Sequence, residues 1–260
     1  MNKDEKNRYF CASKLMDMWV LFKKEVSSFF NSLTGYIVII VFLLANSLFL
    51  WVFPGAFNVL DSGYANLDTL FIISPWIFLF LVPAVTMRLF AEEKRSGTIE
   101  LILTKPLNGL QIVLSKYLAG LTLVLFSLLP SLIYFVSVYQ MGNPIGNIDT
   151  GGTWGSYIGL FFLASIYTSI GIFSSSLTEN QIIAFIISML LCFFFFIGFE
   201  SISGLGLLGE FDEILLNLGI NEHYRSMSRG VIDSRDIVYF LGIITAFVFF
   251  TKTVLDSRKW

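Results

Sequence analysis

Residues 87–120 read MRLFAEEKRSGTIELILTKPLNGLQIVLSKYLAG and join two long apolar segments. This stretch is charged, whereas no Lys or Arg occurs between Lys24 and Arg88 or between Lys116 and Arg225. Basic residues that flank long apolar runs are typical of the connectors between membrane spans. Such a connector is either a solvated turn or a surface that contacts another protein.

The composition indicates a membrane protein. The chain has 260 residues, of which 55% are hydrophobic, 17% are aromatic and only 14% are charged. A soluble domain is about a quarter charged and about half apolar. A transmembrane helix needs about 20 apolar residues, whereas β-barrel strands are shorter and alternate apolar with polar residues. We therefore predict an all-α polytopic membrane protein with six transmembrane helices, over about 36–53, 69–87, 117–139, 153–174, 181–199 and 237–255.

The basic residues outside these runs predict the orientation, because cytoplasmic loops are enriched in Lys and Arg. Six lie in residues 1–35, five in residues 88–116 and three at the C-terminal end, together 14 of the 17 in the chain. The other three share residues 200–236 with seven carboxylates. We therefore predict that both termini are cytoplasmic.

The residues before the first run divide into two parts. Residues 1–13 are charged and without a pattern, and we predict a disordered cytoplasmic tail. From residue 14 onward, apolar residues recur at steps of three and four, with mostly polar residues between them. We predict that residues 14–34 form an amphipathic helix lying in the membrane interface. An amphipathic helix packed in the protein core is the alternative.

The connector, residues 88–116, contains several helix start and stop signals. The Ser-Gly-Thr at residues 96–98 ends an extension of the second span, since Gly often stops a helix and Ser or Thr often starts one. A short helix over residues 99–103 follows, and Asn108 with Gln111 resembles a capping box that opens the third span. Signals this dense predict an ordered knob that docks on a partner. A solvated loop is the alternative.

The long segment over residues 200–236 also departs from a simple loop. Its leucines and isoleucines alternate with glycines and carboxylates. We predict an outer re-entrant loop of short amphipathic helices that pack on, or dip into, the outer leaflet.

The sequence offers no group of residues suited to catalysis, metal binding or cofactor binding. His223 is the only histidine and has no second ligand at metal-binding spacing, so we interpret it as a solvated loop residue. The six runs carry no charge at their centres, which argues against an intramembrane enzyme and against an ion-coupled transporter. The chain lacks a G-x-x-x-x-G-K-S/T phosphate loop, so it cannot hydrolyse ATP by that route alone. We predict no catalytic residue, no metal, no cofactor and no nucleic-acid partner.

The pattern AEEKRSGTIELILTKPL at residues 91–107 resembles the connector of ABC-2-type transporter permeases. That family also has six spans, an interfacial helix before the first span and short re-entrant helices between the fifth and sixth. The resemblance therefore covers about residues 14–255. Residues 53–68, 74–94 and 139–162 resemble more closely the gliding-motility-associated permeases of Bacteroidetes, the GldF type.

The resemblance implies the permease subunit of an ATP-driven, exporter-like ABC transporter in the bacterial inner membrane. Its implied partners are a cytoplasmic ABC ATPase dimer, membrane lipid, and either a second permease copy or a paralogous membrane subunit with a large periplasmic domain. In the family, the connector inserts into a cleft of the ATPase and transmits its closure to the spans. Carried onto this sequence, the ATPase-coupling residues are Glu92, Glu93, Arg95, Gly97, Thr98, Glu100 and Leu101. The alternative function is a non-transporting membrane anchor or mechanotransmission subunit that passes ATPase motion to a periplasmic partner.

Overall fold

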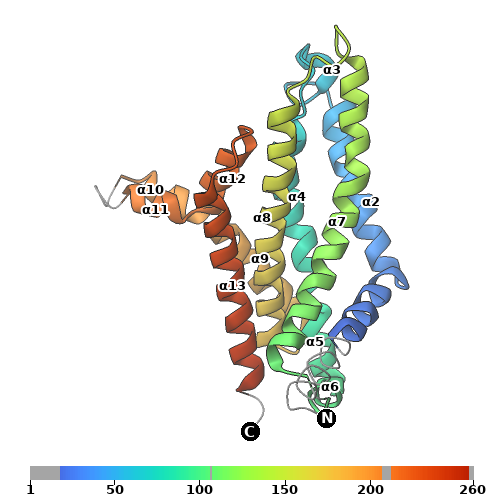
Figure 1. Ribbon diagram of the computed structural model, residues 1–260, viewed down its shortest axis with the longest axis vertical. Helices are drawn as coiled ribbons and strands as arrows, with labels where there is room; N and C mark the ends of the chain where they lie inside the picture. Colours follow the sequence, from blue (N-terminus) through green and yellow to red (C-terminus); the bar gives the residue numbers. More distant parts are fainter. Residues whose placement is uncertain (1–17, 106, 207–211, 258–260) are drawn as a thin grey trace, which may run out of the picture.

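The structure is a computed structural model that describes residues 18–105, 107–206 and 212–257 (Figure 1). Over these residues the chain is all-helical, and six helices are long and apolar enough to span a membrane. The candidate spans are Leu33–Val52, Asp68–Arg95, Gly109–Met141, Thr150–Leu177, Gln181–Ser203 and Ser234–Asp256. The predicted fold class is thereby confirmed. The predicted tail over residues 1–13 lies outside the described residues.

Several spans combine more than one helical segment. The first joins α2 (Leu33–Ser47) to the π-helical turn η1 (Leu48–Val52), and the second joins α4 (Asp68–Thr86) to α5 (Arg88–Arg95). The third, fourth and sixth are the unbroken helices α7 (Gly109–Met141), α8 (Thr150–Leu177) and α13 (Ser234–Asp256). The fifth consists of α9 (Gln181–Phe193), η2 (Phe194–Gly198) and α10 (Phe199–Ser203). The remaining helices are α3 (Val59–Ser62), α6 (Thr98–Leu103), α11 (Asp212–Leu218), α12 (Ile220–Ser228) and a helix over residues 18–30 that precedes α2.

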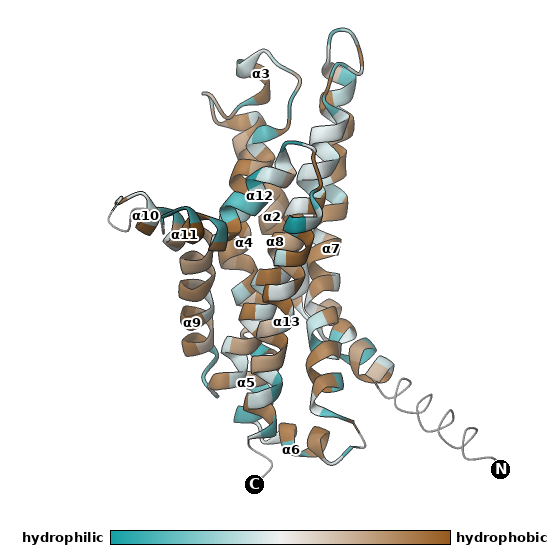
Figure 2. Ribbon diagram, turned by 60° about the vertical axis from the view of Figure 1, so that its left-hand side comes forward, coloured by the Kyte–Doolittle hydropathy of each residue, from teal (hydrophilic) through white to brown (hydrophobic). Residues whose placement is uncertain are grey.

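Helix α8 lies at the centre of the bundle (Figure 1). Of its most apolar stretch, 78% is buried, against 22% in the fifth and in the sixth candidate span. Helix α8 contacts α4, α7, α9, α12 and α13. Small residues permit this close packing. A Cβ at Gly171 would lie 2.0 Å from Thr86 Oγ1 of α4, and a Cβ at Gly155 would lie 2.7 Å from the carbonyl oxygen of Met227 on α12. The outer helices are mostly hydrophobic along their length, as a surface against lipid requires (Figure 2).

The two ends of the bundle carry different elements. The helix over residues 18–30, the pair α5 and α6, and the last turn of α13 lie at one end (Figure 1). Helix α3 lies at the other end. We refer to the first end as the connector end, and its cytoplasmic location stays a prediction.

Residues 200–236 contain the short helices that the sequence predicts. Helix α12 is bound to the bundle, because the hydroxyl of Tyr224 donates to the carbonyl oxygen of Phe71 on α4 at 2.7 Å and Met227 is fully buried. Helices α10 and α11 instead project sideways from the bundle (Figures 1 and 2). Residues 207–211, which separate them, lie outside the described residues. The position of these helices in the outer leaflet stays a prediction.

The interpretation of His223 as a solvated loop residue is wrong. His223 lies on α12 with its side chain only 15% exposed, and its Nδ1 atom is 2.7 Å from Asp236 Oδ1. Its Nε2 atom is 2.9 Å from the carbonyl oxygen of Asn217, and its ring stacks on Tyr239 at 3.8 Å between centroids. Asp236 and Tyr239 belong to α13, so spacing along the chain does not reveal them. His223 joins α12 to α13.

Candidate functional site

The connector contains two short helices joined at Gly97. Helix α5 ends at Arg95, and Gly97 adopts a φ of +71°, which glycine reaches at little steric cost. Helix α6 begins at Thr98, and Ser96 Oγ lies 2.9 Å from both the Glu92 carbonyl oxygen and Thr98 Oγ1. The predicted sequence of helix, break and short helix is therefore confirmed.

Helix α6 has one buried face and one exposed face. Ile99 and Ile102 belong to the hydrophobic core. Glu100 and Leu101 point the other way, and Leu101 is 67% exposed. An exposed leucine beside a carboxylate gives α6 a small apolar and acidic surface at the connector end, which we call the outer face of α6.

Ser175 of α8 attaches α5 to the central helix. Its hydroxyl donates to the carbonyl oxygen of Met87 at 2.7 Å. Ser175 Oγ in turn accepts the backbone N–H groups of Phe90 at 3.0 Å and Ala91 at 3.1 Å. These N–H groups lie at the start of α5, where intrahelical partners are missing. The serine therefore holds the junction of α4 and α5 against α8.

A second contact fixes the other end of α5 to α8. The ammonium of Lys94 is buried and donates to the carbonyl oxygen of Ser176. Because Lys94 is one turn after Phe90 and Ala91, α5 is held along its length rather than at one point.

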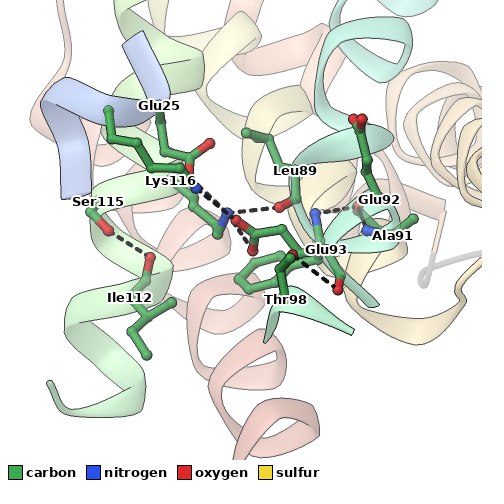
Figure 3. A network of polar contacts seen from close by, with 12 residues as sticks. Glu25, Leu89, Ala91, Glu92, Glu93, Thr98, Ile112, Ser115 and Lys116 are labelled. Carbon is green, nitrogen blue, oxygen red and sulfur yellow. Dashed lines mark hydrogen bonds and ion pairs between the residues drawn. The ribbon is translucent and has the colours of Figure 1, made fainter. Parts of the chain in front are cut away.

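A group of four charged residues joins α5 to α7 and to the helix over residues 18–30 (Figure 3). Lys116 Nζ lies 2.8 Å from Glu93 Oε2 and 3.1 Å from Glu25 Oε1. It also donates to the carbonyl oxygen of Leu89 at 2.8 Å. Lys24 Nζ lies 3.1 Å from Glu25 Oε1 and 3.2 Å from Glu93 Oε1. We call Lys24, Glu25, Glu93 and Lys116 the charge cluster.

The charge cluster is formally balanced, with two basic and two acidic side chains. The Lys116 side chain is fully buried, and buried charges are tolerated where they are paired and hydrogen-bonded. Burial alone would lower the pKa of Lys24, but the carboxylates of Glu25 and Glu93 outweigh it, so this pKa is raised. Lys24 therefore keeps its positive charge at neutral pH.

Lys116 lies inside a helix and not in the predicted connector. Helix α7 starts at Gly109, and the Asn108 N–H donates to Gln111 Oε1 at 3.0 Å, as the predicted capping box requires. The predicted connector over residues 88–116 therefore ends earlier. Lys116 lies two turns inside α7, where its side chain is fully buried.

The seven predicted coupling residues divide into two sets. Glu93 is buried in the charge cluster. The others are exposed at the connector end: Glu92, Arg95, Gly97, Thr98, Glu100 and Leu101. Sequence reasoning missed Glu25, Lys116 and Ser175, because their contacts join residues far apart along the chain.

This arrangement can transmit movement. A force on the outer face of α6 reaches α5 across Gly97, and α5 is bound to α8 through Ser175 and to α7 through Lys116. Close-packed, hydrogen-bonded elements move together rather than deform. Within the described ranges, no three His, Cys, Asp or Glu side chains come together to hold a metal ion.

The comparisons with known proteins point to one family. A family model described as an ABC-2 family transporter protein matches residues 19–216, about three quarters of the chain. The matched region includes α5, α6, Ser175 and the whole charge cluster. No curated protein matches the chain.

Proposed function

The chain belongs to the ABC-2 family of transporter proteins, and we propose that it is the permease subunit of an ATP-driven exporter whose ATPase is a separate cytoplasmic protein. The observation that carries the proposal is the position of α6. Its outer face, with Glu100 and Leu101, is exposed at the connector end, while its neighbour α5 is bound to three other elements. A docking surface attached to the spans in this way suits a subunit that is moved by a partner.

The contacts of α5 give the route that the movement would take. An ATPase that closes on ATP displaces the outer face of α6, and α6 displaces α5. Ser175 then carries the displacement to α8, and Glu93 carries it to Lys116 of α7 and to the helix over residues 18–30. The predicted coupling residues thus act at two stages, since the exposed ones meet the ATPase and Glu93 passes the movement on.

The identity of the complex is a finer proposal. The resemblance of residues 53–68, 74–94 and 139–162 to GldF-type permeases supports a gliding-motility-associated transporter of the bacterial inner membrane. The complex would contain two ATPase subunits, and either a second copy of this chain or a paralogous membrane subunit with a large periplasmic domain.

Affinity purification of the full chain in mild detergent, followed by mass spectrometry, tests the proposal. We expect a cytoplasmic protein with a phosphate-binding loop to co-purify in the presence of ATP. If no such protein co-purifies in any of several mild detergents, the proposed docking role of α6 is wrong.

A mechanotransmission subunit without cargo remains the second candidate, and three buried hydroxyls inside the helix bundle favour it over transport of a polar cargo. The buried hydroxyls of Ser127, Thr168 and Ser174 each donate to a carbonyl oxygen of their own helix. These hydroxyls are therefore satisfied and offer little to a polar solute, which suits an apolar cargo or none. ATP-dependent flux into reconstituted vesicles that contain the ATPase separates the two, since only a transporter moves cargo.

A further inference from the structure

A cavity of about 770 Å³ lies far from the charge cluster, between α4, η2, α10 and α12. One wall is apolar and aromatic, with Phe71, Ile72, Pro75 and Trp76 from α4 and Phe196 and Ile197 from η2. Helix α4 and the π-helical turn η2 both belong to candidate membrane spans. Small-molecule sites typically have volumes of about 300–1,000 Å³, so this cavity can hold a ligand of that size.

Two contacts fix the elements that line the cavity relative to one another. Tyr224 on α12 donates to the carbonyl oxygen of Phe71 at 2.7 Å and fixes α12 across the end of α4. Trp76 packs edge to face against Phe196 with 5.9 Å between ring centroids. Trp76 is nevertheless 43% exposed and lines the cavity, so part of its surface can meet a ligand.

The other lining residues are polar and charged. Arg225 Nη1 lies 3.3 Å from Glu200 Oε1, and Asn221 Nδ2 donates to Glu200 Oε2 at 2.6 Å. Asp68, in the first turn of α4, also lines the cavity and is exposed. The charged lining is therefore two carboxylates and one guanidinium, with a formal excess of one negative charge.

We propose that this cavity binds a zwitterionic phospholipid whose headgroup carries a protonated amine, such as phosphatidylethanolamine. The Asp68 carboxylate accepts hydrogen bonds from the ammonium, and the face of Trp76 adds a cation–π contact. Arg225 donates to the phosphate, for which its planar guanidinium is well suited. The acyl chains lie along Phe71, Pro75 and Phe196, where the spans meet the hydrocarbon of the bilayer.

The charge balance distinguishes this lipid from an anionic one. A headgroup that keeps the phosphate but has no amine brings a net negative charge to a lining that already has one in excess. Phosphoethanolamine without acyl chains would lose the contact with the aromatic wall. The proposal goes beyond the function proposed above, and it holds whether or not an ATPase docks on α6.

Native mass spectrometry of the delipidated full chain, titrated with single phospholipids, tests the proposal without the ATPase. We expect phosphatidylethanolamine to bind about tenfold more tightly than phosphatidylglycerol with identical chains, a difference of about one charge-assisted hydrogen bond. Free phosphoethanolamine should bind far more weakly than the intact lipid. Equal binding of the two phospholipids by the wild-type chain would overturn the proposal, and this comparison needs no variant.

Matched variants then assign the binding to this cavity. Asp68→Asn should remove the preference for phosphatidylethanolamine, whereas Glu222→Gln, an exposed carboxylate of α12 outside the cavity, should keep it. Arg225→Gln should weaken the binding of both phospholipids about equally, and Arg229→Gln should weaken the binding of neither. A preference that persists in Asp68→Asn would show that the lipid binds elsewhere. Gel filtration of each variant identifies one that has not folded. If Asp68→Asn does not fold, Asp68→Glu takes its place, and because it keeps the charge it must retain the preference for phosphatidylethanolamine.

Discussion

Lys116 on α7 and Glu93 on α5 form an ion pair, with 2.8 Å between Nζ and Oε2 and the lysine side chain fully buried. These two residues flank α6 and the segment that leads into α7. The pair therefore joins the helices of the second and third candidate spans on either side of α6 and makes the segment between them part of a closed structural unit. Glu25 binds the same ammonium, so the helix over residues 18–30 belongs to this unit.

The first prediction concerns the lysine of this pair. Lys116→Met replaces the ammonium by an apolar side chain of similar length and, among the described residues, leaves Glu25 and Glu93 with Lys24 as their basic partner. Removing one partner of a buried ion pair costs about 3–5 kcal/mol, so we expect a clear fall in the melting temperature of the detergent-solubilised protein.

Two further variants check the cause. Lys105→Met, at an exposed position of the connector, should change stability by no more than about 0.5 kcal/mol. Adding Glu25→Gln to Lys116→Met removes the excess carboxylate and should restore part of the loss. A double variant less stable than Lys116→Met alone would mean that the cluster does not behave as a charge-balanced group.

The second prediction concerns the attachment of α5 to α8. Ser175→Ala removes a hydroxyl that serves three backbone groups and leaves the buried N–H groups of Phe90 and Ala91 without that acceptor. An unsatisfied buried donor costs about 1–3 kcal/mol. We expect the amides at the start of α5 to exchange hydrogen at least tenfold faster in this variant.

Ser174→Ala is the matched control, because the Ser174 hydroxyl is also buried but donates only to Ile170 within α8. Its α5 amides should exchange at the wild-type rate. Equal exchange in the two variants would show that Ser175 does not hold α5.

The fold was predictable because its main features are local. Long apolar runs specify the six spans, the glycine at residue 97 separates α5 from α6, and the cap at Asn108 marks the start of α7. The cap itself implies that Lys116 lies inside α7 and not in the loop before it. Its pairing with Glu25 was not predictable, because the two residues are 91 positions apart and meet only after the helices pack.

The third prediction concerns the outer face of α6. Glu100→Arg reverses the charge at an exposed position, so it should weaken co-purification of the ATPase without changing membrane insertion. Glu222→Arg makes the same change on α12, far from the connector end, and should leave co-purification intact. Unchanged recovery of the ATPase with Glu100→Arg would refute the assignment of α6 as the docking surface.

The last prediction concerns the break between α5 and α6. Gly97 has a φ of +71° and its N–H donates to the Lys94 carbonyl oxygen at 3.2 Å. Gly97→Pro removes this donor and forces φ to about −65°, so the outer face of α6 can no longer keep its orientation on α5. Apart from its chain neighbours, no atom of the described residues lies within 4 Å of a Cβ built at Gly97, so the effect comes from the backbone and not from side-chain volume. We expect this variant to uncouple ATP hydrolysis from span movement, measured as the ATP-dependent change in distance between labels on α4 and α9. Gly97→Asn, whose side chain tolerates positive φ, should stay coupled, and normal coupling in Gly97→Pro would show that the orientation of α6 is not what transmits the movement.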